Sequence, residues 1–294
     1  MLFLLLAVSM LACLLCGIIT KLFTQRYGDR SVVQHFHNAL VSLISGIALL
    51  ALGGLPDASV FTIVLGLVFG LITALQKITT LQALSCGPYA YTTVISCLST
   101  LIPALSGAIF WQEHIAPVQY VGIVLMLGCF VLSVNVSGEQ KKASLKWLLY
   151  ALAAFLCTGG IGVMQKWHQS TVYKMELDAF LIIAFAFSFL YSTVFCLLQA
   201  RKAGSAAELK PVVKLLPLAL LVLAGICVAA NNKLNLFLAG EIDSAVFYPV
   251  VNGGHLVLTT LIAVVFFRER LTKRQWLGLA LGTISVLLLC NPFA

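Results

Sequence analysis

The chain has 294 residues, of which 61% are hydrophobic and 10% charged, and its mean hydropathy is +1.04. A soluble domain carries about 45–50% apolar and about 25% charged residues, so this chain cannot cover itself with a polar surface and must be surrounded largely by lipid. The net charge of +8 does not indicate a nucleic-acid partner, because the basic residues lie in short loops between apolar runs, where membrane topology explains them.

Ten apolar runs follow one another along the chain, each near the ~20 residues that a membrane-crossing helix needs. They span 1–20, 32–53, 58–84, 88–110, 116–136, 145–167, 179–200, 212–239, 243–266 and 272–291. The connections are too short to hold a soluble domain. The sequence therefore predicts an all-α integral membrane protein with ten transmembrane helices. The nine cysteines lie almost entirely inside these runs and are interpreted as reduced packing residues, and no motif indicates a metal or a cofactor.

One long stretch occurs twice: residues 76–122 recur without a gap as residues 232–278. The matched pairs are Lys77 with Lys233, Glu113 with Glu269, Gln119 with Gln275 and Gly122 with Gly278. A weaker match joins the first run to the sixth. We therefore predict two five-helix repeats, 1–138 and 139–294. Because five is odd, the second repeat enters the membrane from the opposite side, which gives an inverted pair.

The basic residues also predict an orientation. Fourteen of the 18 Lys and Arg residues lie in the connections on one side of the membrane, and only Lys166 and Lys174 lie on the other. The positive-inside rule makes the basic side cytoplasmic and places both termini outside. We expect a multi-pass protein of the plasma membrane.

In both repeats a long apolar helix ends in an acidic residue, followed by a linker with Gln and Gly and another apolar helix. The two copies read LIPALSGAIFWQEHIAPVQYVGIVLML and LTTLIAVVFFRERLTKRQWLGLALGTISVLLL. This pattern resembles the ten-helix EamA-like members of the drug/metabolite transporter superfamily. The first copy departs from it mildly, with Gln112-Glu113-His114 where the second has Arg268-Glu269-Arg270. The resemblance implies a secondary transporter of small metabolites or drugs, often an exporter, and does not identify the substrate.

Two lysines lie at matching depths inside their predicted spans, Lys77 and Lys233. An ionisable residue there costs at least ~2.5–3.5 kcal/mol, so it usually faces a cavity or a partner. All ten Asp and Glu residues lie in loops or at helix ends, so we expect neither lysine to have a carboxylate partner. Three interpretations stay open: the lysines bind an anionic substrate or ion, they are deprotonated when the cavity is empty, or they extend to the interface.

Polar residues near these lysines are the other candidates for a substrate site. The predicted substrate-binding residues are Lys77, Lys233, Gln76, Asn231, Asn232, Asn252 and His255. Hydrogen bonding between helices is the alternative role of the amides. His255 is the only histidine expected deep in a span, so it is the candidate proton carrier, against the alternative of a packed core residue. Glu113 and Glu269 are expected to be structural acids at helix ends that pair with the loop after them, rather than coupling residues.

We expect a secondary active transporter of a small, anionic or carboxylated metabolite, with the substrate bound between the repeats and exposed to each side in turn. The sequence has no GxxxxGK[ST] motif, so a proton gradient or substrate exchange would drive transport. A multidrug exporter of cationic or lipophilic compounds is the alternative, and a membrane enzyme acting on lipid-linked substrates is a third. The Gly278-x-x-x-Gly282 motif is typical of close helix packing, either inside one chain or in a homodimer.

Overall fold

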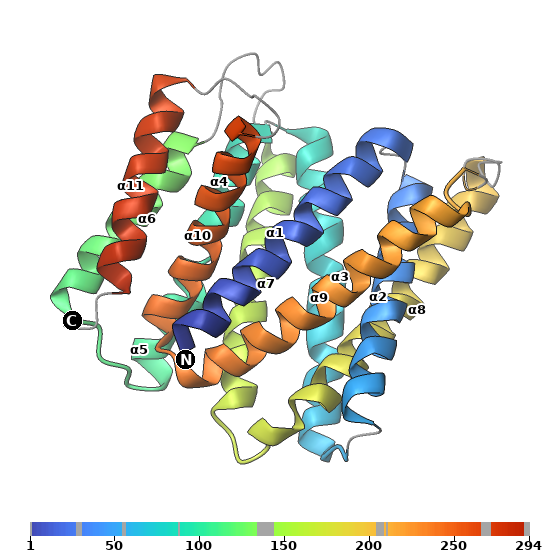
Figure 1. The fold of residues 1–294 in the computed structure, drawn as a ribbon, viewed down its shortest axis with the longest axis horizontal. Coiled ribbons are helices and arrows are strands. Elements are labelled where there is room, and N and C mark those ends of the chain that lie inside the picture. Colours follow the sequence, from blue (N-terminus) through green and yellow to red (C-terminus); the bar gives the residue numbers. More distant parts are fainter. Residues whose placement is uncertain are drawn as a thin grey trace. The chain divides into compact units, whose positions relative to one another are not determined.

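The computed structural model describes residues 2–27, 31–54, 57–87, 89–133, 144–203, 209, 211–265 and 272–290. These residues form eleven α-helices and one short 3-10 turn, η1 (Figure 1). The elements are α1 (Leu2–Tyr27), α2 (Ser31–Gly53), α3 (Val60–Cys86), α4 (Tyr89–Leu98), α5 (Leu101–Phe110), α6 (Pro117–Ser133), α7 (Leu145–Gln169), η1 (Lys174–Glu176), α8 (Leu177–Ala203), α9 (Leu215–Glu241), α10 (Ser244–Val265) and α11 (Lys273–Leu289).

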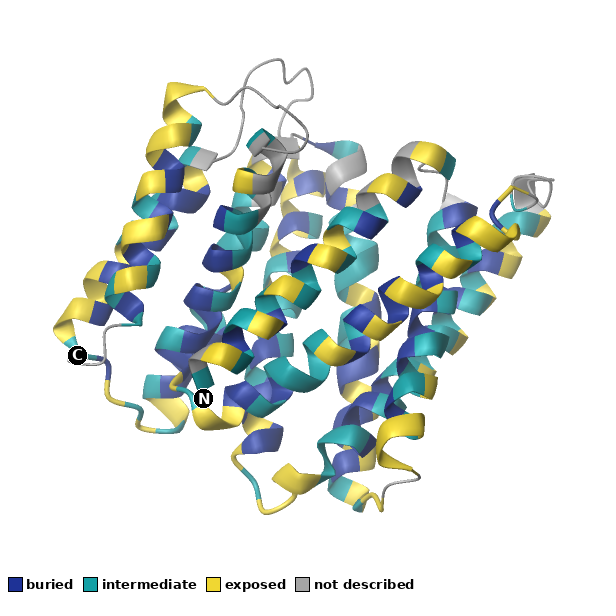
Figure 2. Cartoon of the chain, in the orientation of Figure 1, coloured by how far each residue is buried: buried dark blue, intermediate teal, exposed yellow. Residues whose placement is uncertain are grey.

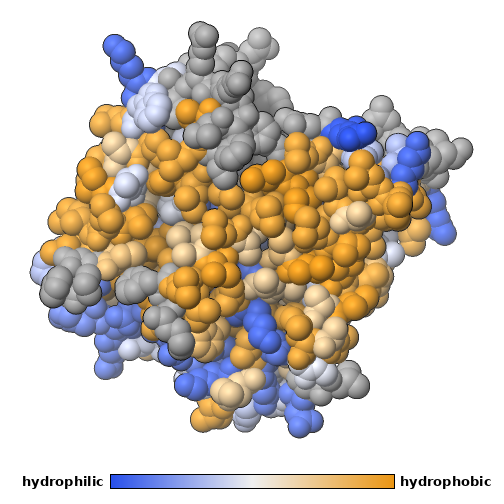
Figure 3. All heavy atoms as spheres, viewed as in Figure 1, coloured by the Kyte–Doolittle hydropathy of each residue, from blue (hydrophilic) through white to orange (hydrophobic). Residues whose placement is uncertain are grey.

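Five of the described helices are long and apolar enough to cross a membrane, and shorter apolar helices accompany them. α9, with 27 residues, extends about 40 Å at 1.5 Å per residue. Exposed residues run along the helices instead of gathering at their ends (Figure 2), and many of them are hydrophobic (Figure 3). Leu52, for example, is 80% exposed and Leu215 is 85% exposed. Surfaces of this kind belong in lipid, so the prediction of an all-helical, multi-pass membrane protein is confirmed.

The predicted run 88–110 is interrupted, and two helices stand in its place. α4 ends at Leu98, five residues before Pro103, and α5 begins at Leu101, two residues before it. Proline has no N–H to donate to the carbonyl four residues earlier, here that of Ser99, and its ring crowds that carbonyl. The turn at Ser99 and Thr100 is therefore a consequence of Pro103. With α4 and α5 taken as one interrupted span, the described helices correspond to the ten predicted runs.

The chain folds into two compact units. Unit 1 comprises Met1–Ala74 and His168–Phe237, and unit 2 comprises Leu75–Trp167 and Leu238–Ala294. Each unit takes helices from both predicted repeats, and the boundaries fall inside α3, α7 and α9. A repeat defined by sequence and a unit defined by packing are different divisions, so the assignment of repeats to 1–138 and 139–294 stays a prediction.

Unit 1 is built around the packing of α2 on α8. Small hydroxyl residues sit at the helix contacts: Ser42 Oγ donates to Ser188 Oγ over 3.0 Å, and Ser45 Oγ donates to the carbonyl of Gly225 in α9 over 2.8 Å. A hydrophobic cluster that includes Phe23 of α1 and Leu221 of α9 fills the remaining space. Hydroxyls and close backbone approach are the usual means of joining helices in lipid.

Unit 2 is built around the packing of α6 on α11, with α10 against α5, α6 and α11. Ser285 Oγ donates to the carbonyl of Gly122 over 2.6 Å. A Cβ atom at Gly282 would lie 2.6 Å from Cys129 Sγ and 2.9 Å from a methyl group of Val257. Gly282 thus allows α11 to pack on α6 and α10, which assigns this glycine of the small-residue motif to packing within the chain.

Candidate functional site

The polar face of α9 forms the first cluster of predicted site residues, in unit 1. Ser9 Oγ of α1 lies 3.0 Å from Asn231 Oδ1 and 2.5 Å from Asn235 Oδ1, and Asn235 Nδ2 donates to Asn231 Oδ1 over 3.4 Å. Residues four apart share one face of a helix, so the two amides meet the same serine. Asn232 instead donates to the carbonyl of Val228 on its own helix, over 2.9 Å.

Lys233 lies in the same cluster and has a carboxylate partner. Its Nζ donates to Asp178 Oδ2 over 2.8 Å. The expectation that neither lysine would be paired is therefore wrong for Lys233. The reason is geometric: Asp178 lies at a helix end, as the sequence indicated, but a lysine side chain is long enough to reach from α9 to the first turn of α8.

Asp178 lies in the first turn of α8. A negative charge there interacts favourably with the helix dipole. A Cβ atom at Gly53 would lie 3.0 Å from Asp178 Oδ2, so the end of α2 comes close to this carboxylate. The Lys233 side chain keeps 36% of its surface exposed and that of Asp178 keeps 21%. An ammonium group has three donors, so the accessible Lys233 has donors beyond the one that binds Asp178.

Lys77 and Gln76 lie on the part of α3 that belongs to unit 2. Gln76 Nε2 donates to Thr80 Oγ1 over 3.2 Å. Both Gln76 and Lys77 are partly buried. Among the described residues, the Lys77 ammonium has neither an ion pair nor a hydrogen bond, unlike that of Lys233. The two lysines, which are equivalent in sequence, thus have different electrostatic surroundings.

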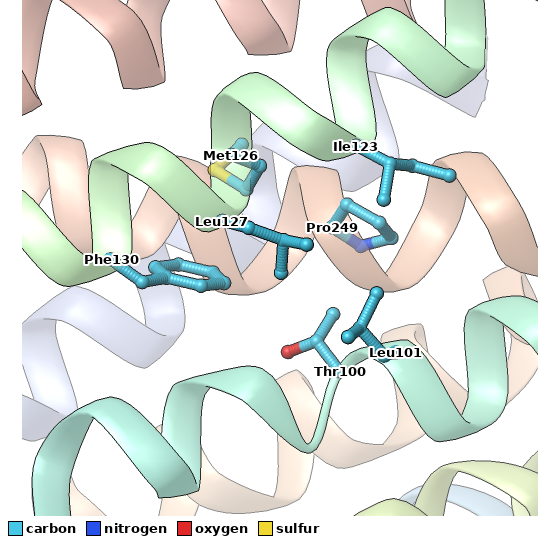
Figure 4. A pocket seen from close by; sticks show the side chains of 7 residues that line it. All are labelled: Thr100, Leu101, Ile123, Met126, Leu127, Phe130 and Pro249. Carbon is cyan, nitrogen blue, oxygen red and sulfur yellow. The ribbon is translucent and has the colours of Figure 1, made fainter.

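The break between α4 and α5 is the second polar point of unit 2. Asn252 Nδ2 of α10 donates to Thr100 Oγ1 at the break, over 3.2 Å. A small pocket of about 10 Å³ lies beside it, lined by Thr100, Leu101, Pro249 and four apolar residues of α6 (Figure 4). This volume holds about one water molecule, so the pocket by itself is too small for a metabolite. His255, one turn further along α10, is partly buried.

Glu113, predicted to be a structural acid, follows α5 and joins three parts of unit 2. Its carboxylate binds the Lys166 ammonium at 2.5 Å, and its Oε2 accepts the backbone N–H of Ser244, the first residue of α10, over 2.7 Å. A carboxylate at a helix N-terminus satisfies a donor that the helix cannot use itself. The partner is thus Lys166 of α7, and the expectation of a partner in the following loop is wrong for Glu113. Glu269 lies outside the described residues.

Sequence reasoning missed Asp178, Lys166 and Ser244. Lys166 was counted among the loop residues, yet its side chain is only 10% exposed. No pattern in the sequence could pair it with Glu113, since the two are far apart along the chain. Asp178 offered a weak signal, because an acid directly before a long apolar run lies at the membrane boundary, within reach of a lysine in a neighbouring span.

The predicted site residues thus fall into two groups, Lys233 with Asn231 and Asn232 in unit 1, and Lys77 with Gln76, Asn252 and His255 in unit 2. Amides, hydroxyls and ammonium groups of this kind can bind a polar solute and move it out of water. Within the described residues, no group of three His, Cys, Asp or Glu side chains could hold a metal ion.

A bundle of apolar helices with polar side chains at their contacts defines a polytopic membrane protein. The EamA-like transporter family model matches residues 145–291, which is half of the chain, and the chain belongs to this family. The family consists of transporters, not enzymes, so the alternative of a membrane enzyme is excluded. The matched residues fall within the second predicted repeat.

The fold is also found among solved structures, of which 29 chains match. One crystal structure is similar to this chain with a TM-score of 0.73 and 18% sequence identity, covering 97% of this chain and 94% of its own. At this identity the likeness shows the fold alone. No curated protein matches the chain.

Proposed function

We propose that the protein is a secondary active transporter of a small, anionic or carboxylated metabolite, which it moves by alternating access between its two predicted repeats. Membership of a transporter family supports transport as such. The sequence lacks a P-loop for ATP, so a proton gradient or substrate exchange supplies the driving force.

The observation that carries the choice of substrate is Lys77. It lies within a long apolar helix, partly buried, and has no acceptor among the described residues. An ammonium at membrane depth is costly unless a partner or a water-filled cavity receives it. A carboxylate of the substrate is a partner that also explains why transport would be selective, because a charge-assisted hydrogen bond contributes about 1.5–3 kcal/mol.

Lys233 contributes differently. Since Asp178 already neutralises it, this pair carries no net charge and can bind uncharged polar groups of a solute through the free donors of the ammonium. Ser9, Asn231 and Asn235 extend the same polar face. The proposed site residues are therefore Lys77 in unit 2, which suits a negative charge, and Lys233 with its neighbouring amides in unit 1, which suit uncharged polar groups.

Transport by purified protein in liposomes tests this proposal. A thermal-shift screen of mono- and dicarboxylates first finds a ligand, because binding to the folded state raises its melting temperature. Uptake of that ligand is then compared for wild type, Lys77→Met, Lys77→Arg and Lys233→Met. Lys146→Met at the exposed start of α7 is the control.

We expect Lys77→Met to weaken the apparent affinity about tenfold to a hundredfold, the equivalent of one charge-assisted contact. Lys77→Arg keeps the charge and should lose less, whereas Lys146→Met should behave as wild type. Unchanged affinity for the anion in both Lys77→Met and Lys233→Met would refute the proposed site.

Asp178 favours a second candidate, an exporter of cationic or lipophilic drugs. Its carboxylate is partly accessible and lies beside the polar face of α9, where a cationic drug could displace Lys233. Cells that express wild type or Asp178→Asn can be screened for resistance to cationic drugs. Resistance that disappears in Asp178→Asn would favour drug export over metabolite transport.

We further propose that the protein lies in the plasma membrane with its basic loops in the cytoplasm. The distribution of Lys and Arg supports this orientation. The test is to label the variant Lys174→Cys from outside intact cells, in a background that lacks reactive native thiols. A homodimer stays a prediction, which the mass of the protein–detergent complex can decide.

A further inference from the structure

His168 is a fully buried histidine that the predicted substrate site does not use. It lies at the end of α7, in unit 1, with 0% of its surface exposed. The ring of Phe180 lies 4.7 Å from the imidazole ring and that of Phe61 lies 6.5 Å from it, centroid to centroid. Although aromatic rings surround the His168 side chain, both of its ring nitrogens have hydrogen-bond partners.

The two partners fix which nitrogen carries the proton. Gln169 Nε2 lies 3.2 Å from His168 Nδ1, and an amide nitrogen can only donate. Nδ1 therefore accepts, and the proton of the neutral ring is on Nε2, which lies 3.3 Å from Thr62 Oγ1. The same Gln169 Nε2 also donates to the carbonyl of Lys174, over 3.3 Å, so this amide ties the histidine to the turn of residues 170–176.

On the other side, two hydroxyls join His168 to a carboxylate. Ser59 Oγ lies 3.1 Å from Thr62 Oγ1 and 2.7 Å from Glu176 Oε2. A carboxylate only accepts and a hydroxyl has one proton to give, so Ser59 donates to Glu176 and accepts from Thr62. The bonds from His168 through Thr62 and Ser59 to Glu176 all run in one direction, toward the negative charge.

The charged groups around His168 single out Glu176. On the turn, Lys174 presents its backbone carbonyl to Gln169, and its side chain is exposed. On α8, Asp178 binds Lys233. On α3, the groups that reach the histidine are Phe61 and the Thr62 hydroxyl. Glu176 is thus the charge that is linked to the imidazole, and it lies on a turn whose neighbours Val172 and Met175 are more than 80% exposed.

We propose that His168 and Glu176 form a proton-binding site whose occupancy controls the turn of residues 170–176. A proton from solvent forms a bond with the lone pair of Nδ1, no covalent bond is broken, and the neutral imidazole becomes an imidazolium. The net charge of the cluster changes from −1 to 0, with the imidazolium stabilised through Thr62 and Ser59 by Glu176. A buried charge otherwise carries a large desolvation cost.

Proton uptake has a mechanical consequence at Gln169. Once Nδ1 carries a proton, it must donate, and the Gln169 amide must turn to offer its oxygen. Its Nε2 then leaves the carbonyl of Lys174, and the turn loses its bond to α7. The proton thus acts as a second ligand of the transporter; this role in transport rests on the proposed function, whereas proton binding itself does not.

The test uses the full-length protein in nanodiscs. Histidine labelled with ¹⁵N is titrated by NMR, with the His168 signal assigned by its loss in His168→Gln, and hydrogen exchange of the peptide 170–176 is followed by mass spectrometry. Glu176→Gln and Thr62→Val remove the charge and the connecting hydroxyl. His114→Gln, in an exposed loop, is the matched control.

We expect His168 to become protonated within about pH 5–8, together with faster exchange in the turn. At a given pH the protonated fraction should be smaller in Glu176→Gln and Thr62→Val, and the change in the turn should be lost in His168→Gln and kept in His114→Gln. A His168 that stays neutral throughout this range overturns the proposal, as does a turn that exchanges equally at both ends of it. If His168 titrates and the turn responds, but the purified protein transports no metabolite, the proton site stands and the proposed transport function fails.

Discussion

The ammonium of Lys233 lies 2.8 Å from the carboxylate of Asp178, although Lys233 belongs to the interior of α9 and Asp178 to the first turn of α8. Lys233 therefore lies in the membrane as part of an ion pair, which lowers the free energy of burying its ammonium there. Lys77, its counterpart in the predicted repeat, has no such partner among the described residues. The two halves of the chain share a pattern, but they place their charges differently.

The pair predicts the effect of Asp178→Asn on stability. Removal of the carboxylate leaves an ammonium without a counter-charge, and since both side chains are partly exposed, we expect a loss of about 1–2 kcal/mol, between the values for exposed and buried pairs. The double variant Asp178→Asn with Lys233→Met should recover most of this loss, because it removes the ammonium together with its counter-charge. Thermal unfolding in detergent measures it, with the exposed Asp57→Asn as the control. A double variant as unstable as the sum of the single ones would show that the pair has no role of its own.

The Glu113 carboxylate predicts a larger effect, because both it and its partner Lys166 are almost fully buried. Glu113→Gln leaves the Lys166 ammonium uncompensated and weakens the acceptor for the N-terminus of α10. We expect the free energy of unfolding to fall by about 3–5 kcal/mol. Glu241→Gln, at the exposed end of α9, should change it by less than about 0.5 kcal/mol. Equal losses in the two variants would contradict the structural role that we predict for Glu113.

The fold could be predicted from the sequence because lipid imposes a simple rule: each span must be a long apolar helix. The same rule does not decide which charged ends meet. The sequence places Asp178 and Lys166 outside the interiors of the spans, at helix ends or in connections, yet their partners Lys233 and Glu113 are distant in sequence. His168 was missed for the same reason, since its environment comes from α3, η1 and α8, and a histidine at the end of an apolar run looks like any residue at the interface.

The interruption at Ser99 and Thr100 leads to a prediction for Pro103→Ala. Alanine restores the missing donor and favours a continuous helix, so the free energy of unfolding should rise by up to about 3 kcal/mol. A continuous helix would turn Thr100 away from Asn252, and transport should fall while the protein becomes more stable. Pro117→Ala is the control, because proline is tolerated at the first position of a helix such as α6. Unchanged transport in Pro103→Ala would show that the interruption between α4 and α5 is not required for transport.

The hydrogen bond from Asn252 to Thr100 predicts a measurable coupling between α10 and the break. A double-mutant cycle with Asn252→Leu and Thr100→Val isolates it, since each single variant removes one partner. Hydrogen bonds between membrane helices contribute about 0.6 kcal/mol on average, and we expect a coupling of this size in unfolding experiments. If Asn252 also contacts the substrate, Asn252→Leu should weaken the apparent affinity for substrate more than Thr100→Val does. Equal affinities in the two variants would show that Asn252 has only a structural role. Comparison of the two readouts therefore decides whether this predicted site residue binds substrate or only holds the interrupted helix in place.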